Sequence, residues 1–177
     1  PALPPPRSTA DIVRLLDHYK PDPTIAAKAL AEADTKPPAT EERQVLFDFY
    51  WQRGRAAGVV GRVSQQIADL RLAAEYASAS NGNDTVRVLR ELATAEHQGG
   101  NLLNATRATA DAIRATPEKQ NGQLLAGYQQ SAGQLPQLGD LAGAKEALRN
   151  AEAVLARVRQ GRNWIDYQYT WQAQLER

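Results

Sequence analysis

The sequence contains neither cysteine nor methionine in its 177 residues. Without cysteine, the chain can form no disulfide bond, thiolate metal site or cysteine nucleophile. It has only two histidines, His18 and His97, and neither stands at helical spacing from a nucleophile or a second metal ligand. We therefore interpret both as ordinary helix-surface side chains, and we expect no metal site and no catalytic residue.

An excess of one sign of charge is also missing, because 21 Lys and Arg residues face 20 Asp and Glu residues. Nucleic-acid-binding proteins usually carry a basic stripe that neutralises phosphates, so the balance predicts no nucleic-acid partner. No apolar run approaches the roughly 20 residues that a membrane-spanning helix needs. A phosphate loop and a dinucleotide-binding motif are absent too, so we expect no membrane span and no cofactor.

The alternation of polar and apolar residues that marks a half-buried strand is not found. Apolar residues instead recur at helical spacing between proline, glycine and capping residues, which predicts an all-α chain of nine helices. The predicted capping residues are Ser8, Asp22, Thr40, Asp84, Asn101 and Asp140. The residues expected on the interior faces include Ile12, Val13, Ile25, Leu30, Val45, Leu141 and Leu148.

Glycines at three expected turns, Gly61, Gly100 and Gly139, are separated by 39 and 39 residues. This spacing indicates an internal repeat, because unrelated helices would not keep it. At the same period three further columns coincide: Ala73, Ala112 and Ala151; Leu70, Thr109 and Leu148; Gly54, Ala93 and Ala132. We interpret the small residues as helix crossings and the larger ones as contacts toward the next unit.

With these features the chain resembles the tetratricopeptide repeat (TPR) family. The middle unit matches through Leu89, Leu92, Ala93, Gly100, Ala105, Ala112 and Pro117. It departs from the family pattern at Gln66, which replaces a small residue, at Arg53 and Ser131, which replace a leucine, and in its period of 39 residues. The resemblance implies a right-handed superhelical solenoid of four antiparallel helix pairs, followed by an unpaired last helix.

We divide the chain into a proline-rich leader (1–8), a TPR-like helical repeat domain (9–162) and a terminal unpaired helix (163–177) that we expect to continue in the parent protein. The first residue is proline and not methionine, so we expect a processed or excised piece, and we favour a periplasmic or secreted location over the cytoplasm. Residues 5–12, 20–23 and 53–56 also resemble the amino-terminal repeat regions of bacterial exported TPR proteins, some of which carry a CHAT-type peptidase domain.

In the TPR family the first helix of each pair lines a concave groove. The positions that the resemblance carries over are Asp48, Trp51, Arg55, Arg87, Arg90, Thr94, Gln129 and Gly133. The Lys and Asn pairs by which some relatives clamp a terminal carboxylate are absent. The arginines are either holders of an acidic ligand or ordinary solvated side chains. Trp51 is either an interaction hot spot or a core residue of its helix.

The function expected from this resemblance is a protein or peptide binding scaffold and not an enzyme. One alternative is a substrate-positioning or regulatory repeat region of a larger enzyme such as a CHAT-type peptidase. Another is a homo-oligomerisation module that dimerises through the carboxy-terminal helix, where Trp164, Tyr167, Tyr169 and Trp171 gather. The uncharged stretch between Lys119 and Asp140 is either a helix covered by its neighbours or a neutral contact patch.

Overall fold

The computed structural model describes residues 8–18, 22–77 and 82–160, and of residues 15–18 it describes the backbone alone. These residues form helices and contain no strand. The helices are α1 (Thr9–His18), α2 (Pro23–Ala33), α3 (Arg43–Val59), α4 (Val63–Tyr76), α5 (Gly82–Gln98), α6 (Leu102–Ala115), α7 (Asn121–Gln134), the 3-10 turn η1 (Leu135–Leu138) and α8 (Leu141–Arg159). The predicted all-α class is confirmed. Most of the predicted leader and the predicted last helix lie outside the described residues.

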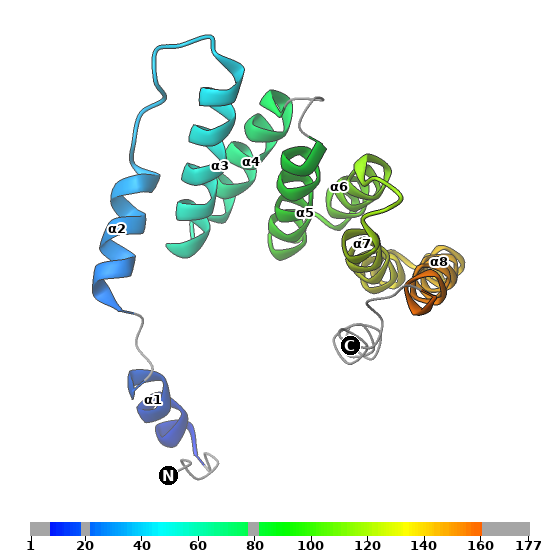
Figure 1. Ribbon diagram of the computed structural model, residues 1–177. Helices are drawn as coiled ribbons and strands as arrows, with labels where there is room; N and C mark the ends of the chain where they lie inside the picture. The colour runs from blue at the N-terminus through cyan, green and yellow to red at the C-terminus, as the bar shows by residue number, and fades with distance from the viewer. Residues whose placement is uncertain (1–7, 19–21, 78–81, 161–177) are drawn as a thin grey trace.

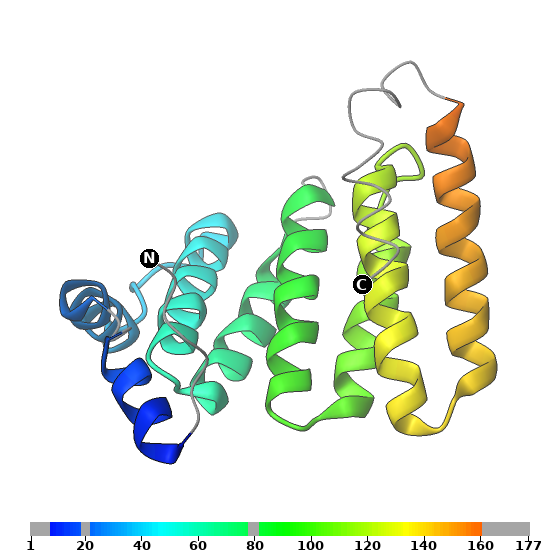
Figure 2. The same ribbon diagram turned by 90° about the horizontal axis from the view of Figure 1, so that it is seen from below.

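The helices follow one another in chain order along a curved row (Figure 1). The most extensive packing joins α3 to α4, α5 to α6 and α7 to α8, and successive pairs also touch. The α5–α6 and α7–α8 turns lie at the same end of the molecule (Figure 2). Helices α3, α5 and α7 line the inner side of the curve, and α4, α6 and α8 the outer side (Figure 1).

The turn inside each of these three pairs has the same geometry. Gly61, Gly100 and Gly139 have φ angles of +75°, +78° and +80°, in the left-handed region that glycine tolerates best. The N–H of the residue after each glycine donates to a carbonyl five residues earlier, at 2.8, 2.8 and 3.0 Å. These bonds satisfy carbonyls at the end of the preceding helix. The glycines predicted from the spacing therefore form equivalent turns.

Small residues stand where the two helices of a pair approach each other. Ala73, Ala112 and Ala151 are all buried, as the repeat predicts. A Cβ atom added at Gly54 would lie 3.2 Å from the Cβ of Asp69. A larger side chain at these positions would push the helices apart, because protein interiors are close-packed.

The first two helices do not form a fourth pair. Helix α2 packs on α3 through Ala29 and Ala33, which join Ala56 and Ala57 in one core cluster. Helix α1 has no comparable packing on another described helix (Figure 1). The residues predicted to be interior on these helices, namely Ile12, Val13, Ile25 and Leu30, are exposed. The prediction of four pairs was wrong here because periodicity marks an apolar face but does not say which element covers it.

Leu148 was also wrongly expected in the interior, since it is 48% exposed. Its repeat counterpart Leu70 is buried in a cluster with α5, and its counterpart Thr109 donates to Gln134 Oε1 on α7 at 2.8 Å. Both counterparts are covered by the next pair, and no described helix follows α8. Val45 and Leu141 are exposed as well, in the first turns of α3 and α8.

Two of the predicted caps are correct and two lie off the helix start. The carboxylate of Asp22 accepts the N–H of Thr24 at 2.8 Å, and that of Asp140 accepts the N–H of Gly143, also at 2.8 Å. Thr40 accepts from Glu42 just before α3 begins, and Asp84 lies inside the first turn of α5. Asn101 stands at the N-cap of α6 without a capping bond, because its amide donates to Glu96 at 2.8 Å. Ser8 accepts the N–H of Asp11 at 3.1 Å, as predicted for the start of α1.

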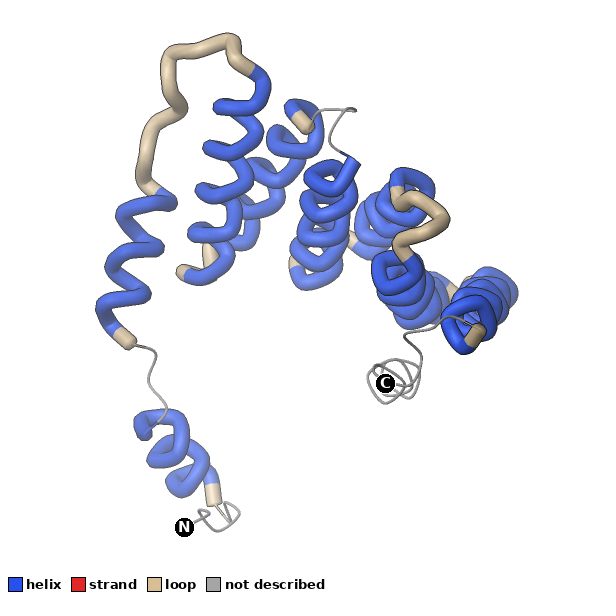
Figure 3. The backbone as a smooth tube through the Cα atoms, in the orientation of Figure 1, coloured by secondary structure: helices blue, strands red, loops and turns tan. Residues whose placement is uncertain are grey.

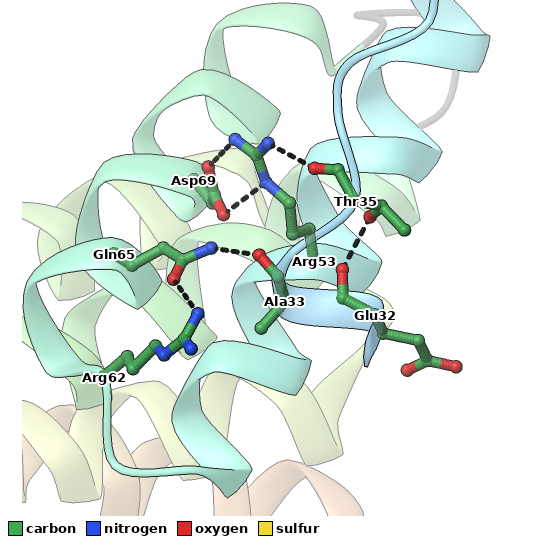
Figure 4. A network of polar contacts seen from close by, with 7 residues as sticks. All are labelled: Glu32, Ala33, Thr35, Arg53, Arg62, Gln65 and Asp69. Carbon is green, nitrogen blue, oxygen red and sulfur yellow. Dashed lines mark hydrogen bonds and ion pairs between the residues drawn. The ribbon is translucent and has the colours of Figure 1, made fainter. Parts of the chain in front are cut away.

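A polar network ties the long α2–α3 connection to α4 (Figures 3 and 4). Arg53 donates to the carbonyl of Thr35 at 2.9 Å and forms two hydrogen bonds with the carboxylate of Asp69. These hydrogen bonds raise the pKa of Arg53 above its usual value. Gln65 on α4 donates to the carbonyl of Ala33 at 2.6 Å. The connection is thereby held against the α3–α4 pair at two points.

Candidate functional site

A groove of about 650 Å³ lies among α3, α4, α5 and α7. Its lining residues are mostly polar and comprise Arg55, Gly58, Val59, Gln66, Arg87, Arg90, Glu91, Thr94, Gln98 and Gln130. Four of the residues carried over from the TPR pattern, Arg55, Arg87, Arg90 and Thr94, are among them. The other four, Asp48, Trp51, Gln129 and Gly133, are not part of this lining.

Trp51 supports two of the groove arginines. The guanidinium carbon of Arg87 lies 4.4 Å from the centre of the Trp51 ring, and that of Arg55 lies 5.3 Å from it. The indole N–H donates to Glu91 Oε2 at 2.9 Å, and the ring stacks on the core residue Phe47 with centres 5.9 Å apart. Trp51 is thus half-buried, partly in the core and partly against the arginines. A guanidinium stacked in this way keeps its N–H edge available for a ligand.

The groove holds more positive than negative charge. Its lining has three arginines and one carboxylate, Glu91, which gives a formal charge of +2. Glu91 Oε2 already accepts from Trp51 and lies 3.8 Å from Arg55 Nε. Arg87 and Arg90 have no ion pair with any described residue, and Arg90 Nε is buried without a hydrogen-bond partner.

Arginines elsewhere are neutralised by nearby carboxylates. Those with a partner carboxylate within 2.9 Å are Arg14, Arg53, Arg62, Arg71, Arg114, Arg149 and Arg157. The unpaired guanidinium groups of the groove contrast with this pattern, and they give the inner surface a local field that the net charge of +1 hides.

Side-chain amides complete the lining. Gln66 reaches the groove from α4 because Gly58 on α3 leaves space for it; a Cβ atom at Gly58 would lie 2.6 Å from Gln66 Nε2. On the other side, Gln130 Nε2 lies 3.4 Å from the hydroxyl oxygen of Thr94. Each amide offers both a donor and an acceptor to a bound molecule.

Sequence reasoning missed Gln66, Gly58, Glu91 and Gln130 as groove residues. Gln66 was noticed only as a departure from the small residue of the TPR pattern, and its match with a glycine on the facing helix was the available signal. Gln130, not the expected Gln129, lines the groove. One residue along a helix turns the side chain by about 100°, so a small error in the helix register is enough to exchange the two.

Three of the remaining expected residues have other surroundings. Asp48 accepts a long hydrogen bond of 3.3 Å from Gln44 on its own helix. Gly133 is the one exposed residue of α7, and the rest of that uncharged helix is buried or half-buried between its neighbours. The neutral stretch is therefore a covered helix and not an open patch, as the first of the two interpretations predicted.

The chemistry of the groove is that of hydrogen bonding and charge pairing. In residues 8–18, 22–77 and 82–160 no three His, Asp or Glu side chains converge on a point that could hold a metal ion. No helix of this part of the chain is long and apolar enough to cross a membrane. His97 is bonded to Gln137 at 3.1 Å, and the side chain of His18 lies outside the described atoms. Comparison of the chain with protein-family models, with curated proteins and with solved structures finds no match.

Proposed function

We propose that this chain is a scaffold of the tetratricopeptide kind, a right-handed solenoid that binds another protein through a peptide segment laid in its inner groove. The observation that carries the proposal is the groove itself, to which α3, α5 and α7 bring polar side chains on the inner side of the curve. Stacked helix pairs characteristically present such extended concave surfaces to their ligands.

The equivalent turns at Gly61, Gly100 and Gly139 support a repeat architecture, because each closes a helix pair in the same way at a constant interval. The lining supports binding in preference to catalysis. It contains one carboxylate, Glu91, and no histidine, so it has many hydrogen-bond donors but no paired acid and base.

Selection from a random dodecapeptide library displayed on phage would test the proposal. The variant Thr94→Trp places a large ring in the groove, and the matched control Ala110→Trp places one on an exposed site of α6 that does not line it. Selected peptides should bind the wild-type chain and the control but not Thr94→Trp. Failure to enrich any peptide, or equal binding to both variants, would overturn the proposal.

The solution mass distinguishes this function from homo-oligomerisation. A scaffold of this kind is expected to be a monomer when no ligand is present, so light scattering should give a mass near 19.3 kDa. A concentration-independent dimer whose interface excludes the selected peptides would favour the oligomerisation module instead.

A further inference from the structure

We infer that the ligand of this groove is an extended acidic peptide whose carboxylates pair with Arg87 and Arg90. The inference rests on the proposed function and adds the chemical class of the partner. It follows from the groove's unpaired guanidinium groups, from the platform on which one of them is held, and from the amides that flank them.

Arg87 and Arg90 stand three residues apart on α5, which places them on neighbouring positions of one helix face. Both line the groove and neither has a carboxylate partner in the described part of the chain. Arg90 Nε is in addition buried and unsatisfied. Adjacent like charges and an unsatisfied buried donor are both unfavourable. A carboxylate placed between the two guanidinium groups would relieve both, since each can offer it two parallel N–H groups.

Trp51 makes this arrangement ready for a ligand. Arg87 lies flat enough on the indole for its guanidinium carbon to be 4.4 Å from the ring centre, and Glu91 fixes the indole through its N–H. A guanidinium held on a ring loses less side-chain freedom on binding than a solvated one. Glu91 is engaged with Trp51, so it does not neutralise Arg87 or Arg90.

The amides favour a peptide over a small acid. Gln66, Gln98 and Gln130 line the same groove on three different helices, and each can donate to a carbonyl and accept from an N–H. An extended backbone supplies these two groups at every residue, whereas a small dicarboxylate supplies only acceptors. A polynucleotide is disfavoured because the groove has three arginines and a carboxylate and not a continuous basic stripe.

Fluorescence anisotropy with two labelled octapeptides tests the inference. One peptide alternates glutamate with serine, and the other carries glutamine in place of each glutamate. The charge-removing variant is Arg87→Gln with Arg90→Gln. The control, Arg114→Gln with Arg149→Gln, removes the same charge from exposed residues that pair on their own helices. Circular dichroism verifies that both variants keep their helices.

The glutamate peptide should bind about tenfold or more tightly than the glutamine peptide, and the groove variant should lose that difference. The control should keep it, apart from a small uniform loss due to net charge. Binding should weaken between about 50 and about 200 mM salt. A second variant, Arg87→Lys with Arg90→Lys, keeps the charge but not the paired N–H groups, and should bind with intermediate affinity.

The emission of Trp51 reports the place of binding. With Trp164 and Trp171 changed to phenylalanine, Trp51 is the only tryptophan of the chain. The glutamate peptide should alter this emission, because it draws Arg87 away from the ring. Equal affinity for both peptides would overturn the acidic-ligand inference and leave peptide binding intact; no binding of either peptide, together with a failed phage selection, would overturn both. Equal losses in the groove and control variants, or displacement of the peptide by oligothymidylate, would also overturn the inference.

Discussion

Arg53 and Asp69 form a doubly hydrogen-bonded ion pair between α3 and α4, with N–O distances of 2.9 and 2.7 Å. The side chain of Asp69 is only 3% exposed and that of Arg53 17%. One period of 39 residues later, the same two positions are occupied by Leu92 and Ala108, which are buried in the core. One structural position therefore accepts either a buried ion pair or an apolar pair.

Removing one partner of this pair should be much more harmful than removing both. Asp69→Ala leaves Arg53 buried without its carboxylate and should lower the free energy of unfolding by roughly 3–5 kcal/mol. The double variant Arg53→Leu/Asp69→Ala copies the pair of the next repeat, and it should recover most of this loss because replacing both charges by apolar groups is often nearly neutral. Urea denaturation of the two variants measures the difference.

A control for this experiment is Arg149→Ala, which breaks an exposed pair with Glu146 and should cost less than about 1 kcal/mol. The double variant also loses the hydrogen bond from Arg53 to the Thr35 carbonyl, worth about 1 kcal/mol. A double variant no more stable than Asp69→Ala would contradict the equivalence of the two repeats at this position.

Two glycine variants isolate the effect of the left-handed turns. Neither Gly100 nor Gly133 has any atom within 4 Å of where a Cβ would stand, but Gly100 has a φ of +78° and Gly133 lies inside α7. Gly100→Ala should destabilise by about 1–2 kcal/mol, and Gly133→Ala should stabilise by about 0.5–1 kcal/mol. Thermal denaturation measures both. Shifts of the same sign would show that the φ angle is not the cause.

The turns and the close helix crossings could be predicted from the sequence because both depend on residues at fixed chain intervals. Gly61 and Ala112 needed only the helical period and the repeat to be assigned. The placement of α1 and α2 could not be predicted, since the apolar faces of these helices do not specify a covering element. The entry of Gln66 into the groove was equally hidden, because it depends on a match with Gly58 across a helix pair.

The groove itself was only partly predictable. The TPR resemblance gave the helix faces and therefore Arg55, Arg87, Arg90 and Thr94. It did not give the pairing state of these arginines, because their carboxylate neighbours are fixed by tertiary packing. Glu91 is the example: it follows Arg90 directly in sequence, yet it accepts from Trp51, 40 residues away.

Overpacking a helix crossing should show whether the alanine column is structural. Ala112 is buried at the equivalent position to Ala73 and Ala151, so Ala112→Leu should destabilise by roughly 1–3 kcal/mol. The exposed change Lys119→Ala should have little effect. Denaturation midpoints that do not differ between the two variants would count against the repeat alignment.

The cap of α2 should titrate at low pH. The hydroxyl of Thr24 donates to the Asp22 carboxylate at 2.7 Å and the Thr24 N–H donates at 2.8 Å, and these two bonds hold the pKa of Asp22 below its usual 3.8. The folded pKa is thus lower than the unfolded one, so the cap stabilises the helix above pH 3.8 and stops doing so as the pH falls through the folded pKa. Carboxyl NMR should find a midpoint below 3.8, and Thr24→Ala should raise it. A midpoint at or above this value would contradict the cap.

Photo-crosslinking tests the central claim, that the inner groove is the binding site, most directly. A glutamate–serine octapeptide carrying a central benzoylphenylalanine would be irradiated with the intact chain, and the attachment sites would be mapped by mass spectrometry. The account predicts crosslinks on groove residues of α3, α5 and α7, such as Val59 and Thr94, and their loss in Arg87→Gln/Arg90→Gln. Crosslinks that fall instead on the outer helices α4, α6 and α8, and that persist in this variant, would contradict it.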